Sequence, residues 1–461
     1  MLQSAFASEG AFGDLDAVKQ WLREQNEKVH VSVNKVRFDQ MEKWGYSSET
    51  GRIRHESGKF FSIDGIRIKT NWGAVPDWDQ PIINQPEVGY LGFITKVIDG
   101  MLHFLVQAKI EPGNVNHVQL SPTLQATRSN YTQIHQGKKP LYLEYFQQAT
   151  PAQILIDQLQ SEQGARFLRK RNRNIIIRTE EDLPHYDNFI WLTLGQLKAL
   201  MHTDNLVNMD TRTVISGICI GSDTNNLQFS STSTHPLAAG FLNSTRDQSQ
   251  AVHSIEAIIT FITALKSTYD LEVDRIDLKK VRNWIFDADA IRHEENKYFR
   301  VIAVDVEIGN REVVKWSQPM VEPAQEGLCA FVCKNINGVL HFAMQAKLEC
   351  GNFDIVEFAP TVQCLTGNYL TSSSSSLPFL DYVLHSRNEQ RILDVLQSEE
   401  GGRFYKEQNR NMIVLAGDDI DDQLPEKFIW LTLGQIHTFL KFNNYLNIQA
   451  RSLISAIPFH E

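Results

Sequence analysis

The sequence lacks the short motifs that define the most widespread nucleotide-using enzymes. It has no Gly-rich dinucleotide fingerprint, no Walker A sequence and no Gly-x-Ser-x-Gly nucleophile motif. It also has no cluster of His, Asp and Glu at metal-binding spacing. These absences argue against the common dinucleotide-dependent oxidoreductases, P-loop enzymes and α/β-hydrolases, and the spacing of His, Asp and Glu indicates no metal site.

Cysteine is scarce, and long apolar runs are missing. No run reaches the ~18 apolar residues of a membrane span, and residues 1–13 lack the basic segment and apolar core of a secretory signal. A formal net charge of −10 argues against nucleic acid or an anionic membrane as the main partner. The cysteines are odd in number, lack zinc-site spacing and predict reduced thiols in a cytoplasmic protein: Cys219, Cys329, Cys333, Cys350 and Cys364.

The sequence does contain a long internal repeat. The segment His103–Asn114 (HFLVQAKIEPGN) returns at His341–Asn352 as HFAMQAKLECGN. Further on, FIWLTLGQ at 189–196 recurs without a change at 428–435. A repeat of this length is a duplicated domain rather than a solenoid module.

A chain of 461 residues also suits two domains. We expect a first repeat domain at 1–220, a linker at 221–250 that is rich in Ser, Thr and Asn, and a second repeat domain at 251–461. Hydrophobic residues make up 42% of the chain and charged residues 22%, as in soluble globular proteins.

The patterning within each unit predicts an α+β fold with mostly antiparallel strands. Residues 15–27 have the apolar spacing of a helix, and capping signatures predict further helices that begin at Thr150, Ser386, Thr193 and Thr432. Asp99-Gly100 is a hairpin signal. In the first unit, strands are expected at 59–69, 89–98, 101–110, 116–126 and 174–178.

The repeated strand carries the candidate functional residues. Side chains alternate along a strand, so Phe104, Val106 and Ala108 would share one face. The opposite face would carry His103, Gln107, Lys109 and Glu111, and its repeat would carry His341, Gln345, Lys347 and Glu349. A solvated strand face is the simpler alternative, but four polar types recurring at one spacing favour a duplicated concave site.

The two units differ just after this strand, and the difference favours the first unit for chemistry. Arg128 aligns with Thr366, and His117 aligns with Ile355. The first copy therefore holds more groups that can titrate or bind phosphate.

The segment Gly89–Thr132, together with FAPTVQCLTGNY in the second unit and SEEGGRFY at 398–405, closely resembles the NDP-hexose 2,3-dehydratase family. The likeness covers nearly the whole chain. It implies a homodimer whose two domains per subunit each have a degenerate Nudix-like mixed sheet with flanking helices. It also implies a dTDP-4-keto-6-deoxyhexose substrate in deoxysugar biosynthesis for antibiotics or polysaccharides. The enzyme would remove the C2 hydroxyl without metal or nicotinamide, and the product would rearrange to a 3,4-diketo-2,6-dideoxy sugar for a separate reductase.

Such a reaction needs a base at C3, an acid at C2 and hydrogen-bond donors to the C4 oxygen. The candidate catalytic residues are His103, Lys109, Glu111 and Tyr131. The candidate substrate-binding residues are Gln107 as an orienting donor, Arg128, Ser129 and Asn130 for the diphosphate, Trp72 or Trp78 stacked on thymine, and Gln80, Gln85 and Asn114. In the second unit, Asn368 and Tyr369 join the counterparts named above.

Each assignment has an ordinary structural alternative. Glu111 and Asn114 could shape a turn, Arg128 could form a surface ion pair, Trp78 could be core, and His103 could be hydrogen-bonded scaffold. Two other functions stay open. One is a non-catalytic sugar-nucleotide-binding or scaffold protein. The other, a Nudix-like hydrolase, is disfavoured because LQSEEGG at 396–402 lacks the Arg-Glu pair of a Nudix box.

Overall fold

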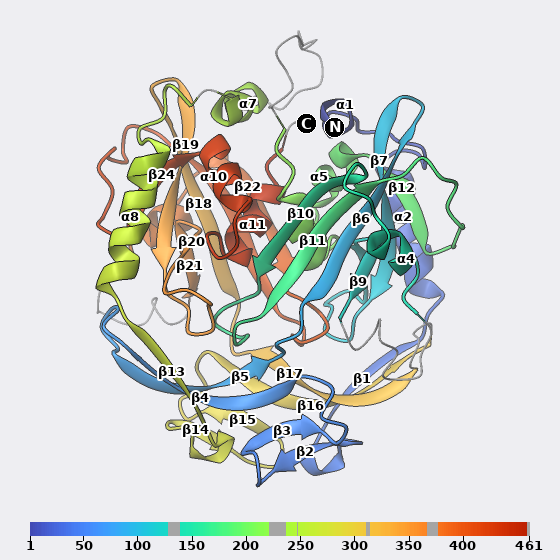
Figure 1. Ribbon diagram of the computed structural model, residues 1–461, viewed down its shortest axis with the longest axis vertical. Coiled ribbons are helices and arrows are strands. Elements are labelled where there is room, and N and C mark those ends of the chain that lie inside the picture. The colour runs from blue at the N-terminus through green and yellow to red at the C-terminus, as the bar shows by residue number, and fades with distance from the viewer. Residues whose placement is uncertain (128–138, 221–236, 247, 310–313, 367–376, 459–461) are drawn as a thin grey trace.

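The computed structural model describes residues 1–127, 139–220, 237–246, 248–309, 314–366 and 377–458. Two large sheets stand next to each other, and two small sheets lie beneath them (Figure 1). The α+β class and the two similar halves predicted from the repeat are confirmed. Over the described residues, none of the helices combines the length and apolar character needed to cross a membrane. All five cysteines are free.

Each half builds one large mixed sheet with the same topology. In the first half the order is β10-β11-β6-β7-β12, with β8 on β7 and β9 on β6. Only β11 and β6 run parallel. The strands are β6 (Gly89–Ile98), β7 (Met101–Ile110), β8 (Val118–Ser121), β9 (Leu124–Ala126), β10 (Ile154–Ser161), β11 (Arg171–Arg178) and β12 (Phe189–Leu192).

The second half repeats this sheet as β24-β19-β18-β23-β22, with β20 on β19 and β21 on β18. Its parallel pair is β18 and β23. The strands are β18 (Gly327–Ile336), β19 (Val339–Lys347), β20 (Glu357–Ala359), β21 (Val362–Leu365), β22 (Arg391–Ser398), β23 (Gln408–Ala416) and β24 (Phe428–Thr432).

The small sheets exchange strands between the halves. One contains β2 (Trp44–Ser47), β3 (Arg52–His55), β4 (Ser62–Thr70), β5 (Asp77–Asn84) and, from the second half, β13 (Leu271–Ile276). The other contains β14 (Trp284–Phe286), β15 (Ala290–His293), β16 (Phe299–Ile308), β17 (Lys315–Pro323) and, from the first half, β1 (Val31–Val36). Because each half donates its first strand to the other, neither half completes its small sheet alone.

Helices cover the sheets and fill the space between the halves. They are α1 (Leu2–Ala5), α2 (Leu15–Glu27), α4 (Leu143–Gln147), α5 (Leu194–Leu200), α6 (Met209–Ile215), α7 (Ala238–Arg246), α8 (Ile255–Thr268), α9 (Leu380–Leu384), α10 (Leu433–Leu440) and α11 (Ile448–Ser455). Short 3₁₀ helices lie at η1 (Phe38–Gln40), η2 (Leu278–Lys280) and η4 (Asn388–Gln390). The predicted helix at 15–27 is confirmed as α2, whose N-cap Asp14 accepts a hydrogen bond from the Ala17 amide at 2.8 Å.

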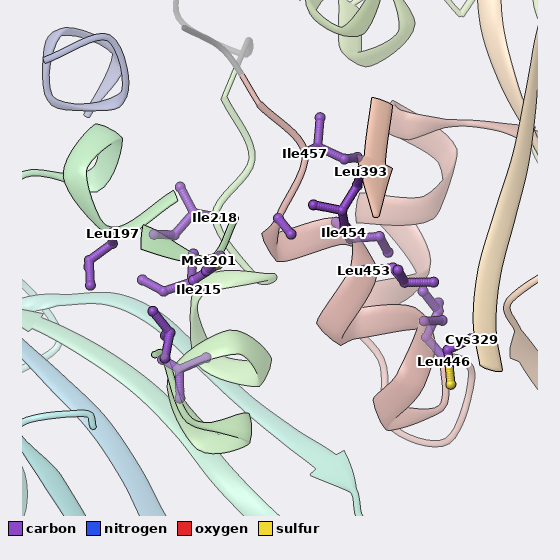
Figure 2. Close-up of a cluster of buried hydrophobic side chains, with 14 of the residues drawn as sticks. Leu197, Met201, Ile215, Ile218, Cys329, Leu393, Leu446, Leu453, Ile454 and Ile457 are labelled. Carbon is purple, nitrogen blue, oxygen red and sulfur yellow. The ribbon is translucent and has the colours of Figure 1, made fainter. Parts of the chain in front are cut away.

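One hydrophobic core joins the two halves. Leu197 and Ile215 from the first half belong to the same buried cluster as Leu453 and Ile454 from the second (Figure 2). Since α6 and α11 pack against each other, the apolar faces of both are removed from water by the other half. Burial of this kind is the main favourable term in holding such an interface together.

Polar contacts across the halves come in matched pairs. The Gly113 amide donates to the Gly401 carbonyl at 2.7 Å, and the Gly351 amide donates to the Gly164 carbonyl at 2.7 Å. This reciprocity is the mark of a two-fold arrangement. The chain is therefore a pseudo-symmetric pair of halves.

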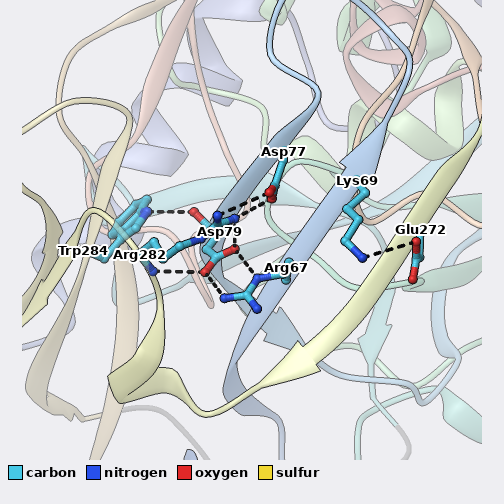
Figure 3. A network of polar contacts seen from close by, with 7 residues as sticks. All are labelled: Arg67, Lys69, Asp77, Asp79, Glu272, Arg282 and Trp284. Atoms are coloured by element: carbon cyan, nitrogen blue, oxygen red, sulfur yellow. Dashed lines mark hydrogen bonds and ion pairs between the residues drawn. The ribbon is translucent and has the colours of Figure 1, made fainter.

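A carboxylate network ties the small sheets together (Figure 3). Asp79 on β5 accepts two hydrogen bonds of 3.0 Å from Arg67 on β4, and one of 2.8 Å from Arg282 of the second half. The Trp284 indole donates to the Asp79 carbonyl oxygen at 3.0 Å. Burial opposes ionisation, but the two guanidinium groups outweigh it and hold the pKa of Asp79 well below its usual range.

Two expected helices are absent where the capping signatures at Thr150 and Ser386 predicted them. Thr150 does bond to Gln153, whose Oε1 accepts from the Thr150 amide at 2.9 Å, but that contact closes a turn before β10. After Ser386, the 3₁₀ helix η4 leads into β22. A side chain that bonds back three residues closes an isolated turn as well as a helix, and here the alternating residues that follow form strands. The strand expected at 116–126 is split into β8 and β9.

Candidate active site

A cavity of about 950 Å³ opens on the large sheet of the first half. Its floor is the polar face of β7, and its walls come from α2, the β2–β3 hairpin, β17 and the loop 400–403. The last two elements belong to the second half. The volume lies at the upper end of the range for small-molecule sites.

Three predicted residues of the repeated strand line this cavity: Gln107, Lys109 and Glu111. The Lys109 ammonium lies 3.8 Å from Glu111 Oε1 and 3.5 Å from the carbonyl oxygen of Gln125 on β9. Gln125 Nε2 in turn donates to Glu111 Oε1 at 2.8 Å. The amide thus orients the carboxylate beside the ammonium group, and Glu111 Oε2 is buried with no hydrogen-bond partner among the described residues.

His103 lies on the same strand face but does not line the cavity. Its Nε2 accepts from the Ala11 amide at 3.0 Å, so its Nδ1 carries the proton and donates to the Met101 carbonyl oxygen at 2.9 Å. Burial lowers the pKa of His103 below its ordinary value. His341 makes the equivalent contacts with the Val252 amide and the Val339 carbonyl. In both rings each nitrogen forms a hydrogen bond, and the rings anchor the chain segments that lead into α2 and α8.

Further ionisable groups surround Glu111 in the cavity wall. Glu400, Asp210 and Glu162 contribute carboxyls, and Lys170 and Arg403 contribute cations. Burial and the neighbouring Glu111 raise the pKa of Glu400 to about 7. Burial and the carboxyls around it raise the pKa of Asp210 well above its ordinary value.

Contacts with Gln85, Gly402 and Phe61 hold the Arg403 side chain in place at the cavity. Its Nε donates to Gln85 Oε1 at 3.2 Å, its Nη1 donates to the Gly402 carbonyl at 2.9 Å, and its guanidinium lies 4.1 Å from the centre of the Phe61 ring. Gln85, predicted to bind substrate, lines the cavity in this contact.

An aromatic wall faces the polar strand across the cavity. Trp44 lies 4.8 Å from Phe61 and 5.5 Å from His55, and His55 lies 4.6 Å from Phe60, measured between ring centres. All four rings line the cavity. Flat aromatic faces of this kind suit a pyrimidine base or the apolar face of a sugar.

The two predicted tryptophan platforms lie elsewhere. Trp78 donates to Gln80 Oε1 at 3.0 Å, and Gln80 Nε2 donates to the Ala165 carbonyl at 3.0 Å, away from the cavity lining. Trp72 packs edge-on against Tyr269, with its ring centre 3.7 Å from the Lys427 ammonium.

Besides Trp44, the cavity is lined by Trp316 on β17, the repeat counterpart of Trp78. Its indole donates to Gln318 Oε1 at 2.8 Å, as Trp78 does to Gln80. The walls of this cavity are therefore drawn from both halves.

Asn114 shapes a turn, as the structural alternative proposed. Its Nδ2 donates to the His117 carbonyl at 2.7 Å, and it does not line the cavity. Six predicted residues lie outside the described part of the chain: Arg128, Ser129, Asn130, Tyr131, Asn368 and Tyr369. The remaining second-half counterparts keep the pattern of the first, since Gln363 Nε2 donates to Glu349 Oε1 at 2.9 Å and Lys347 donates to the Gln363 carbonyl at 3.3 Å.

Several exposed lysines lie at the cavity edge: Lys28, Lys43, Lys139 and Lys315. Glu42 and Asp187 lie there too, so the edge is mixed in sign with an excess of cations. A local excess of positive charge on a chain of net charge −10 suits an anionic ligand. Within the described residues, no group of three or more His, Cys, Asp or Glu side chains is arranged to hold a metal ion.

Comparison with known proteins identifies the family. The sequence model of the NDP-hexose 2,3-dehydratase family matches residues 15–218 and 255–457, one match to each half. A dTDP-4-dehydro-6-deoxy-alpha-D-glucopyranose 2,3-dehydratase of Saccharopolyspora spinosa is 44% identical over 438 residues, which cover 95% of this chain and 90% of the relative. Proteins of the same name are 40% identical in Streptomyces violaceoruber (95% of each chain) and 38% identical in Amycolatopsis orientalis (98% of this chain, 92% of the relative). With a family match in both halves and relatives of this identity along almost its whole length, the chain belongs to the NDP-hexose 2,3-dehydratase family.

Proposed function

We propose that the protein removes water across C2 and C3 of dTDP-4-keto-6-deoxyglucose, as the names of its relatives state for them. The observation that carries the proposal is the cavity in which Gln107, Lys109 and Glu111 meet the aromatic wall. It offers proton-transfer groups at one side and flat apolar surface at the other. The lysines at its edge suit the diphosphate between the sugar and the base.

The proposed first step is the loss of the C3 proton. The C4 ketone acidifies this proton, and Glu111 accepts it because Gln125 and Lys109 hold the carboxylate in place. Lys109 then lies close enough to the same face to stabilise the negative charge on the C4 oxygen of the enolate. The enolate expels the C2 hydroxyl, and the resulting enol becomes a 3,4-diketo-2,6-dideoxy sugar.

We propose that the first half, residues 1–220, is the catalytic half. Residues 251–461 form the proposed second domain. Each large mixed sheet with its flanking helices supports a degenerate Nudix-like fold. The loss of water is redox-neutral, so this step needs no nicotinamide. We also propose a cytoplasmic homodimer whose product is consumed by a separate reductase.

Incubation of the protein with dTDP-4-keto-6-deoxyglucose in D₂O tests the proposal. We expect loss of water by mass spectrometry, with deuterium at C3 of any substrate recovered early. Exchange without water loss would mean that only the base works. Binding with neither event would favour the sugar-nucleotide-binding alternative.

A further inference from the structure

The pseudo-two-fold symmetry allows the two polar faces to be compared position by position. Each half extends a loop onto the other half's strand. A Cβ placed on Gly401 would lie 2.9 Å from the Cβ of Glu111, and a Cβ placed on Gly164 would lie 2.9 Å from the Cβ of Glu349. The loop at 400–403 thus meets the first-half strand as the loop at 163–166 meets the second-half strand.

Most charged positions around the two faces match, and two of the exceptions are carboxyls found only at the first face. Glu400 beside the first face corresponds to Gln163 beside the second. Asp210, the second residue of α6, corresponds to Gln449, the second residue of α11. An amide has nearly the shape of a carboxyl and cannot give up a proton at ordinary pH. The first site therefore has carboxyls at Glu400 and Asp210 where the second has amides, whereas the second has Glu407 and Glu357 where the first has Lys170 and Gln119.

Glu400 is placed to act inside the cavity. Its Oε1 accepts from the Gly402 amide at 3.0 Å, while its Oε2 is buried and has no hydrogen-bond partner among the described residues. A Cβ on Gly402 would overlap Glu400 Oε1 and would lie 3.6 Å from Glu111 Oε1. The two carboxyls therefore border the same glycine. Gln163, in contrast, donates through its Nε2 to Glu399 and is held in the wall.

The surrounding charges favour a proton on this group. Glu111, Glu162 and Asp210 act on Glu400 as like charges, and the cations Arg403 and Lys170 oppose their effect. The negative charge of neighbouring carboxylates opposes the ionisation of Glu400. Burial and the nearby carboxyls together raise the pKa of Glu400 to about 7, which matches the requirement for a general acid at that pH.

We infer that Glu400, supplied by the second half, is the general acid that protonates the C2 hydroxyl as it leaves in the first-half cavity. The inference rests on the proposed function. In the step, the enolate electron pair forms the C2–C3 double bond and restores the C4 carbonyl. The C2–O bond breaks, and the Glu400 proton joins the oxygen to give water. Glu400 is left as a carboxylate beside the newly protonated Glu111, and a proton transfer between the two restores both groups.

The test compares two leaving groups in the variant Glu400→Gln. With the natural substrate, we expect kcat for water loss to fall 10²–10⁴-fold, the usual contribution of a positioned acid, while C3 deuterium exchange persists. A substrate analogue with fluorine in place of the C2 hydroxyl needs no proton to leave. Fluoride release should therefore stay within a few-fold of the wild-type rate.

Glu407→Gln is the control, because Glu407 is a buried carboxyl that does not line the cavity. Burial raises its pKa to about 7, as at Glu400. This variant should keep both reactions. Equal reductions in the rates of water loss and fluoride release in Glu400→Gln, or loss of C3 exchange, would overturn the assignment. Normal water loss would do the same. A wild-type protein that never dehydrates the substrate would instead overturn the proposed function, and the inference with it.

Discussion

Replacing Lys109 with alanine should slow dehydration about 10²–10³-fold, the cost of removing one preorganised donor to an oxyanion, or about 2.7–4 kcal/mol. Only 12% of the Lys109 side chain is exposed, so water is poorly placed to substitute for the ammonium group. The loss should appear in kcat rather than in KM, because the charge on the C4 oxygen develops only after the C3 proton leaves. C3 deuterium exchange should fall by a similar factor, since the enolate itself is destabilised.

Lys347→Ala provides the comparison that isolates this effect. The two ammonium groups have the same local contact, to the Gln125 carbonyl at 3.5 Å and to the Gln363 carbonyl at 3.3 Å. The two variants should therefore lose similar stability in thermal unfolding. Steady-state rates measured by coupled reduction of the product should nevertheless differ by at least tenfold. Equal rate losses in the two variants would refute the assignment of the chemistry to the first half.

Three further results are expected. The rate of dehydration should fall as pH rises through about 7, because the Glu400 carboxyl, with its raised pKa, holds a proton below that pH and loses it above. A pH–rate profile that stays flat through this window would contradict the acid role. Asp79→Asn should lower the free energy of unfolding by about 1.5–3 kcal/mol, since the Arg282 guanidinium loses a charged partner. The difference in stability between variant and wild type should shrink at acid pH, because the wild-type Asp79 carboxylate begins to take up a proton as its low pKa is approached. Urea titrations at two pH values measure this difference. His103→Gln should destabilise the protein yet retain most of kcat per folded molecule, and a loss of kcat without unfolding would return His103 to the chemistry.

Local patterns were sufficient to place the strand that forms the cavity floor. Strand alternation put Gln107, Lys109 and Glu111 on one face, and all three line the cavity. The same alternation included His103, because periodicity gives the face of a residue and not its distance along that face from the site. Repetition of the histidine reflected a repeated anchoring contact.

The residues supplied by the other half could not be found by local reasoning. Trp72 or Trp78 was the expected platform, yet Trp44 and Trp316 line the cavity, and Trp316 comes from the second half, whose small sheet pairs with β1 of the first half. Such pairing depends on contacts between residues more than two hundred positions apart, and no helix or strand propensity reports it. A signal for Glu400 did exist: it is one of the positions at which LQSEEGG departs from LQSEQGA in an otherwise similar repeat.

A crystal structure of the Glu400→Gln variant with dTDP-4-keto-6-deoxyglucose bound tests the central claim most directly, since this variant should bind its substrate and expel water only slowly. The account predicts that the sugar lies on β7, with C3 at Glu111, the C4 oxygen at Lys109 and the C2 hydroxyl at the amide that replaces Glu400. A sugar bound in this cavity with C2 and C3 turned away from residues 111 and 400 would contradict it.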